Sequence, residues 1–111
     1  MISGYGPDYV AINGQRYARS LIVMPDRIIE EWGATSFSAL AEAHFLTLAE
    51  LRPEILLLGT GATLRFPDLR LTQALSAARI GLEVMDTHAA CRTYNILLAE
   101  GRRVVAAVLL G

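Results

Sequence analysis

The chain has 111 residues, enough for one hydrophobic core, and we expect a single domain over residues 1–111. Hydrophobic residues make up 53% of it and charged residues only 19%, so part of the apolar surface is expected to meet a partner protein or a second copy. Ten basic residues, all arginine, face eleven acidic ones; the resulting net charge of −1 argues against binding to nucleic acid.

Several other classes of protein are excluded by simple features of the sequence. One cysteine, Cys91, rules out an internal disulfide and any metal site built from several cysteines. The longest apolar run, Val104–Leu110, is far shorter than the ~20 residues of a membrane-spanning helix, so we expect a buried strand and no membrane insertion. Met1–Tyr5 has neither the basic segment nor the apolar core of a secretory signal, which predicts a cytoplasmic protein.

Short strands and turns dominate the first third of the chain. Tyr9–Ile12 and Gln15–Tyr17 flank Asn13 and Gly14, a pair suited to a two-residue hairpin turn. Two further strands are predicted at residues 21–24 and 28–32. The expected arrangement of this region is an antiparallel β meander.

Helical and strand patterns alternate from residue 41 onward. Apolar residues at helical spacing predict helices over residues 41–51, 71–78 and 87–100. Continuous apolar runs predict strands at residues 55–59, 82–85 and 104–109. Because helix-linked strands form right-handed parallel crossovers, these three strands should lie in one sheet covered by helices. The sequence therefore predicts an α/β fold in which a β meander is followed by an αβαβαβ unit.

The first candidate ligand site follows the strand at residues 55–59. In open α/β sheets, ligands bind beyond the carboxyl ends of parallel strands. Gly59, Thr60 and Gly61 lie at such an end, with Arg65 further along the same loop. Glycine lacks the Cβ that would keep an anion away from backbone N–H groups, so the loop either binds an anion or forms a tight turn.

The second candidate segment begins where the next strand ends. Asp86 or Thr87 is predicted to cap the following helix, whose partly positive N-terminus either accepts a carboxylate or phosphate or is simply capped. His88, Arg92 and Asn95 fall on one face of that helix. Arg92 is expected to pair with Asp86 or with a bound anion, unless this polar face only meets solvent.

No catalytic set accompanies these residues. Cys91, about one turn into the helix, is either a packed core residue or a nucleophile whose thiolate the helix dipole favours. A nucleophile elbow, a metal-ligand spacing and a phosphate loop are all missing from the sequence. We therefore expect no catalytic residues, no metal and no cofactor.

Several of these segments together resemble the Mth-type domain of unknown function. The resemblance rests on Ile2–Gly6, Ile12–Tyr17, Leu58–Gly61, Glu83–Thr87 and Ala89–Asn95. That family includes the mitochondrial complex I assembly factor 3, the adipogenesis-associated Mth domain-containing protein and bacterial hypothetical proteins. The resemblance implies a three-layer α/β fold, with a central mixed sheet flanked by helices on one side and the β meander on the other. It also implies no assigned catalysis, and in mitochondria a role in assembling a respiratory complex at the inner membrane.

Two hypotheses for the function follow. The first is a non-catalytic assembly or protein-interaction module, monomeric or homodimeric, whose partner would be an intermediate in the assembly of a membrane complex. It predicts an exposed apolar patch away from the carboxyl edge of the sheet. The alternative is a small-anion or small-molecule binding protein, or a cryptic enzyme, with a pocket made by Gly59, Thr60, Gly61, Arg65, Asp86, Thr87, Arg92 and Asn95.

Overall fold

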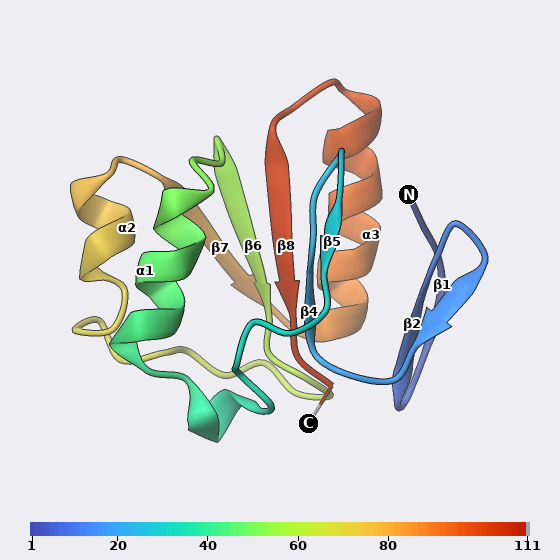
Figure 1. Cartoon of the computed structure of the whole chain (residues 1–111), viewed down its shortest axis with the longest axis horizontal. Coiled ribbons are helices and arrows are strands. Elements are labelled where there is room, and N and C mark those ends of the chain that lie inside the picture. The colour runs from blue at the N-terminus through green and yellow to red at the C-terminus, as the bar shows by residue number, and fades with distance from the viewer. Residues whose placement is uncertain (111) are drawn as a thin grey trace.

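The structure is a computed structural model that describes residues 1–110, and it contains two β-sheets and the helices that cover them (Figure 1). The strands are β1 (Ile2–Gly6), β2 (Tyr9–Ile12), β3 (Gln15–Tyr17), β4 (Leu21–Val23), β5 (Ile28–Ile29), β6 (Ile55–Gly59), β7 (Gly81–Met85) and β8 (Val104–Val108). The helices are the 3-10 helix η1 (Phe37–Ala39) and the α-helices α1 (Glu42–Glu50), α2 (Gln73–Ala77) and α3 (Thr87–Ala99).

The central sheet is mixed and has the strand order β5-β4-β8-β6-β7. As predicted, β6 pairs in parallel with both β7 and β8. The prediction for β4 and β5 was wrong, because β4 pairs antiparallel with β8 and carries β5 into the central sheet rather than into the meander. The predicted strand at residues 28–32 is shorter in the structure, where β5 spans Ile28–Ile29. Within residues 1–110 it pairs with β4 at two positions, Ile22 with Ile29 and Val23 with Ile28.

The separate three-stranded sheet has the order β1-β2-β3. Its hairpin turn is the predicted one: Asn13 and Gly14 both have positive φ, 51° and 87°, and Ile12 lies opposite Gln15. β1, which the sequence patterns did not predict, pairs antiparallel with β2. The meander is thus built from β1 to β3 alone.

The two faces of the central sheet bury different clusters of apolar side chains, as two-sided cover of apolar strands requires. On one face, Leu56, Leu58 and Val105 pack with Phe45 and Leu48 of α1 and with Leu75 of α2. On the other face, Leu57 and Val104 pack with side chains of α3, β1 and β2 that include Ala90, Tyr94, Ile2 and Val10. Helices therefore flank both faces, and α3 shares the side of the meander, which corrects the expected separation of helices from meander.

The predicted helix over residues 71–78 is shorter in the structure, where α2 spans Gln73–Ala77. The backbone N–H groups of Leu71 and Thr72 donate to the carbonyls of Asp68 and Leu69, three residues back, so a tight turn precedes the helix. The predicted helix at residues 41–51 is confirmed as α1. At its start, Nδ1 of His44 accepts a hydrogen bond from the backbone N–H of Ala41 at 2.9 Å, which gives His44 a structural role.

The packing of α3 on β6 requires a glycine at position 59. A Cβ on Gly59 would lie 3.0 Å from Cα of Thr87 and 3.2 Å from Cβ of Ala90, both in the first turn of α3. Backbone atoms of a helix and a central strand have little freedom to move apart, because the interior is close-packed. The absent side chain at Gly59 therefore sets how near α3 lies to the sheet.

We predict that Gly59→Ala lowers the free energy of unfolding by about 1–3 kcal/mol, because the added methyl group overpacks this contact. Gly81→Ala is the matched control, since a Cβ there would meet only the carbonyl oxygen of Glu54 at an ordinary 3.7 Å. Urea unfolding monitored by circular dichroism measures both. Equal stability of the two variants would show that Gly59 is not needed for close packing.

Candidate functional site

The carboxyl ends of β6, β7 and β8 meet the start of α3 at one edge of the central sheet (Figure 1). A cavity of about 390 Å³ lies there. It is lined by the turn after β1, the loop after β6, the first residues of α3 and the end of β8, namely Gly6, Pro7, Gly61, Ala62, Asp86, Thr87, His88, Leu109 and Leu110. We call it the α3 cavity.

Thr87, the first residue of α3, ties three segments together at this edge. Its side-chain hydroxyl accepts a hydrogen bond from the backbone N–H of Gly61 at 2.9 Å and donates one to the carbonyl of Leu109 at 2.6 Å. Its backbone N–H donates to the carbonyl of Gly61 at 2.9 Å. Because Thr87 is only 3% exposed, these bonds are shielded from competing water.

The glycine loop uses its polar groups within the protein. The N–H of Gly61 is taken by Thr87, and the N–H of Thr60 donates to the carbonyl of Met85 at 2.9 Å. The Thr60 hydroxyl donates to the carbonyl of Thr63 at 2.7 Å and accepts from the N–H of Arg65 at 3.1 Å. Anion binding here stays a prediction, and the Gly61 donor that it would use already has a partner.

The cap of α3 is confirmed, with Asp86 as the capping residue. Its carboxylate accepts a hydrogen bond from the backbone N–H of Ala89 at 2.9 Å. Arg92 does not close this cap; its guanidinium donates to the hydroxyl of Tyr5 at 3.0 Å. The expected Arg92–Asp86 pair is therefore replaced by a contact between α3 and β1.

The polar face of α3 is the surface on which β1 lies. His88 Nε2 is 3.0 Å from the carbonyl oxygen of Gly6, and since a carbonyl only accepts, Nε2 carries the proton. The His88 ring also packs on the ring of Tyr5, with 4.4 Å between centroids. Asn95 accepts from the backbone N–H of Ile2 at 2.9 Å and donates to its carbonyl at 2.7 Å. The face therefore contacts β1 through His88, Arg92 and Asn95, while His88 also lines the α3 cavity.

Of the eight predicted pocket residues, the structure brings three together around the α3 cavity: Gly61, Asp86 and Thr87. Gly59 packs against the first turn of α3, and the Thr60 hydroxyl donates to the carbonyl of Met85. Arg92 and Asn95 contact β1. The guanidinium of Arg65 lies 4.4 Å from the ring centre of Phe37. The sequence patterns missed Gly6, Pro7, Leu109 and Leu110; a prediction of β1 would have supplied the first two.

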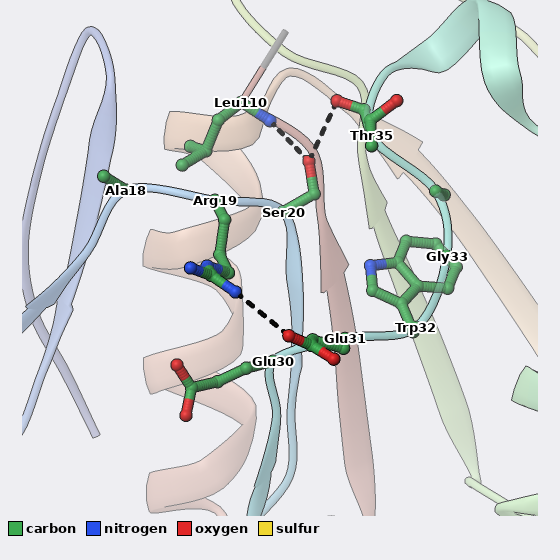
Figure 2. A pocket seen from close by; sticks show the side chains of 10 residues that line it. Ala18, Arg19, Ser20, Glu30, Glu31, Trp32, Gly33, Thr35 and Leu110 are labelled. Carbon is green, nitrogen blue, oxygen red and sulfur yellow. Dashed lines mark hydrogen bonds and ion pairs between the residues drawn. The ribbon is translucent and has the colours of Figure 1, made fainter.

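A second cavity, of about 560 Å³, shares the wall residue Leu110 with the first (Figure 2). It lies between the β3–β4 connection and the segment that follows β5. Its lining consists of Ala18, Arg19, Ser20, Glu30, Glu31, Trp32, Gly33, Ala34, Thr35 and Leu110. We call it the Trp32 cavity, and none of its residues was predicted as a site.

The ionisable groups at the α3 cavity are engaged in structural contacts. Its lining contains Asp86, which caps α3, and His88, which bonds to Gly6. Within residues 1–110, no three His, Cys, Asp or Glu side chains converge as ligands for a metal ion. In the same described range, the helices are too short or too polar to span a membrane.

Sequence comparison identifies proteins similar to this chain. A family described as "Protein of unknown function (DUF498/DUF598)" matches residues 2–109. Human NADH dehydrogenase (ubiquinone) 1 alpha subcomplex assembly factor 3 is 33% identical over 110 residues, which covers 97% of this chain and 59% of the human protein. The chain thus spans less than two thirds of the length of that relative.

Solved structures show the same fold. A Bordetella parapertussis protein superposes with a TM-score of 0.91 at 36% identity, covering 98% of this chain and 93% of that one. A Bordetella pertussis protein described as a Mth938-like domain gives a TM-score of 0.85 at 30% identity, with coverage of 98% and 84%. The predicted resemblance to the Mth-type domain and its α/β fold are confirmed.

Cys91 is predicted to be unreactive in the native protein. The side chain is fully buried on the inner face of α3, and burial raises the pKa of its thiol to about 11, so the thiol stays protonated at about pH 8. Labelling with a disulfide reagent should therefore be slow in the native protein and fast after denaturation. If the native protein were labelled as rapidly as the denatured chain, Cys91 would be accessible and reactive, which would contradict the prediction.

Proposed function

The chain belongs to the DUF498/DUF598 family of proteins of unknown function, and from that premise we propose that it is a non-catalytic interaction module in the assembly of a respiratory NADH dehydrogenase. The proposal takes its direction from the human relative, whose name describes an assembly factor for that enzyme. The chain spans only 59% of that protein. We therefore propose the same role for this chain on the basis of a surface in its own structure.

Three exposed apolar side chains that lie close together in the sequence support the proposal most directly. Leu64, Phe66 and Leu69 are 51%, 73% and 83% exposed, and these three are half of the six large hydrophobic side chains exposed within residues 1–110. We call them the 64–69 patch. Burying such side chains against a partner contributes about 1.5–3 kcal/mol each, which offsets part of the cost of association.

The patch lies on the loop that connects β6 to α2 over residues 60–72. Loops of this length without helix or strand are uncommon in compact domains and are often functional. The loop leaves β6 at the carboxyl edge of the sheet, whereas the interaction hypothesis expected an apolar patch away from that edge (Figure 1). The position was wrong because the prediction assigned this edge to a ligand pocket.

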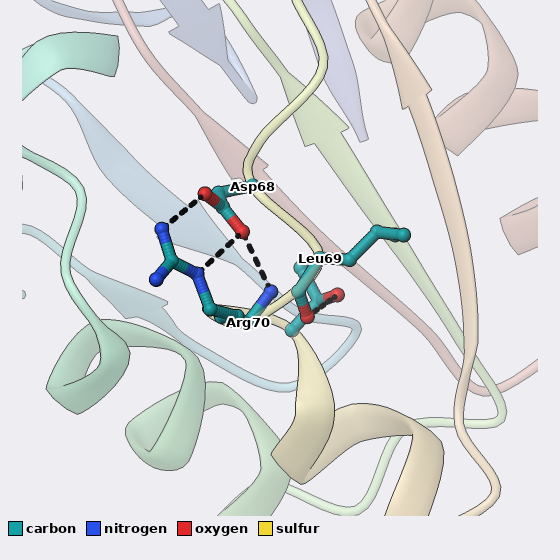
Figure 3. A network of polar contacts seen from close by, with 4 residues as sticks. Asp68, Leu69 and Arg70 are labelled. Atoms are coloured by element: carbon teal, nitrogen blue, oxygen red, sulfur yellow. Dashed lines mark hydrogen bonds and ion pairs between the residues drawn. The ribbon is translucent and has the colours of Figure 1, made fainter.

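Local polar contacts connect residues 68–72 at the end of this loop. The carboxylate of Asp68 accepts from the backbone N–H of Arg70 at 2.9 Å and from its guanidinium at 3.0 Å, while Leu69 extends away from this pair (Figure 3). The hydrogen bonds from Arg70 also hold the pKa of the Asp68 carboxyl below its usual value. Thr72 donates to the carbonyl of Leu69 at 3.1 Å.

The alternative is a small-molecule site in the α3 cavity, and the cavity itself is the observation that favours it. A ligand there would contact Asp86 and His88, whose polar groups are used for the cap of α3 and for the bond to Gly6. The 64–69 patch has no comparable internal role, so the interaction module is the better supported function.

The assembly role is tested by replacing Leu64, Phe66 and Leu69 with serine in a host strain whose own copy of the gene is deleted. We expect the triple variant to fold with a stability close to that of the wild type, because substitutions at exposed sites change it by roughly 0.5 kcal/mol or less. The amount of assembled NADH dehydrogenase on native gels should nevertheless fall to the level of the deletion strain.

Leu46→Ser and Ile96→Ser serve as controls, since these side chains are 46% and 60% exposed on α1 and α3. Both are expected to restore assembly. Full assembly with the triple variant would rule out the 64–69 patch as the docking surface. An unchanged amount of complex in the deletion strain would contradict the assembly role itself.

A further inference from the structure

The Trp32 cavity contains a buried hydrogen-bond donor without a partner. Trp32 is 7% exposed, and its indole nitrogen Nε1 is the buried side-chain polar atom in residues 1–110 that lacks a hydrogen bond. Figure 2 shows the nitrogen edge of the ring turned toward the space between Ser20 and Glu31. An unpaired buried N–H is unfavourable and rare in proteins, so an acceptor supplied by a ligand would be stabilised there.

The orientation of Trp32 is fixed by its surroundings. The His44 ring meets the indole edge-on, with 5.7 Å between centroids and 70° between planes. Gly33, the next residue, has a φ of 96°, and a Cβ on it would lie 3.2 Å from Nε2 of His44. The His44 ring therefore packs against one side of the indole, whose N–H forms part of the cavity wall.

The charged residues of the wall favour a cation. Glu30 and Glu31 face a single basic residue, Arg19, so the formal charge of the lining is −1. Arg19 pairs with Glu31 at 3.4 Å, and their side chains are 59% and 84% exposed. Such an exposed pair is weak and easily rearranged, and Glu30 makes no ion pair within residues 1–110.

A neighbouring strand edge favours a peptide over an isolated cation. Glu30 directly follows β5, which is the edge strand of the central sheet and pairs only with β4. Extended peptides bind at such edges, where they bring backbone carbonyls close to the wall. Ala18, Ala34 and Leu110 add the apolar surface on which the methylene groups of a long basic side chain pack.

We propose that the Trp32 cavity binds a basic peptide segment from a partner protein. An arginine of that segment pairs with Glu30 and Glu31, and a peptide carbonyl next to it accepts the hydrogen bond from Nε1 of Trp32. The planar fork of arginine can pair with a carboxylate through two parallel hydrogen bonds, which the single point charge of lysine cannot do. The exposed Arg19–Glu31 pair is weak enough for the incoming arginine to replace Arg19 as the partner of Glu31.

This site is independent of the 64–69 patch, and either can fail without the other. Trp32 is the single tryptophan of the chain, so its fluorescence and its one indole N–H resonance report on this cavity alone. The probe is the blocked tripeptide acetyl-Ala-Arg-Ala-amide. We expect a saturable downfield shift of the indole proton, with a dissociation constant in the range of about 0.1–1 mM that rises with added salt.

Glu30→Gln should weaken binding of this peptide about three- to tenfold, because it removes the carboxylate that has no internal partner. Glu83→Gln, on the exposed side of β7, is the matched control and should leave the affinity unchanged. The same spectra confirm that both variants are folded. The neutral peptide acetyl-Ala-Gln-Ala-amide should bind at least about tenfold more weakly than the arginine peptide.

Three results would overturn the proposal. The first is the absence of a saturable change with the arginine peptide up to about 10 mM. The second is a failure of either charge control. Equal binding of the glutamine peptide, or an equal loss of affinity in Glu30→Gln and Glu83→Gln, would show that the charge of Glu30 is not used. The third is equal affinity for methylguanidinium, which has no carbonyl to offer Trp32.

Discussion

The hydroxyl of Thr87 is the contact on which the arrangement of this edge depends. It bonds to Gly61 at the end of β6 and to Leu109 at the end of β8, so one buried side chain joins two strands to the first residue of α3. The missing Cβ at Gly59 lets the backbone of α3 come near enough for these bonds to form. Residues that look like an anion-binding loop thereby become the attachment point of a helix.

The position of α3 decides which surfaces remain for partners. Its polar face contacts β1 through His88, Arg92 and Asn95, so the meander is attached to the α/β unit by directional hydrogen bonds as well as by apolar packing. The surfaces available to partners within residues 1–110 include the 64–69 patch and the Trp32 cavity. One offers apolar side chains and the other a negative wall with an unpaired donor, which suits recognition of two different partner segments.

Local patterns predicted the elements that depend on local forces. The Asn13–Gly14 turn, the apolar strand β6 and the Asp86 cap each involve residues close in sequence, and all three are confirmed. β1 was missed because Gly4 and Gly6 dilute its strand pattern and its partners on α3 lie up to 93 residues away. The roles of Thr87 and Trp32 were missed for the same reason, since a hydrogen bond made or left unmade in the interior depends on tertiary packing.

The most direct test of this account is the unfolding free energy of Thr87→Val, which keeps the shape of the side chain and removes its hydroxyl. Thr93→Val, the same change on the same helix, is the control. We expect Thr87→Val alone to lower the free energy of unfolding by about 1–3 kcal/mol, because the buried N–H of Gly61 and carbonyl of Leu109 lose a partner, and to speed amide exchange at Gly61. Equal stability of the two variants, with unchanged exchange at Gly61, would contradict it.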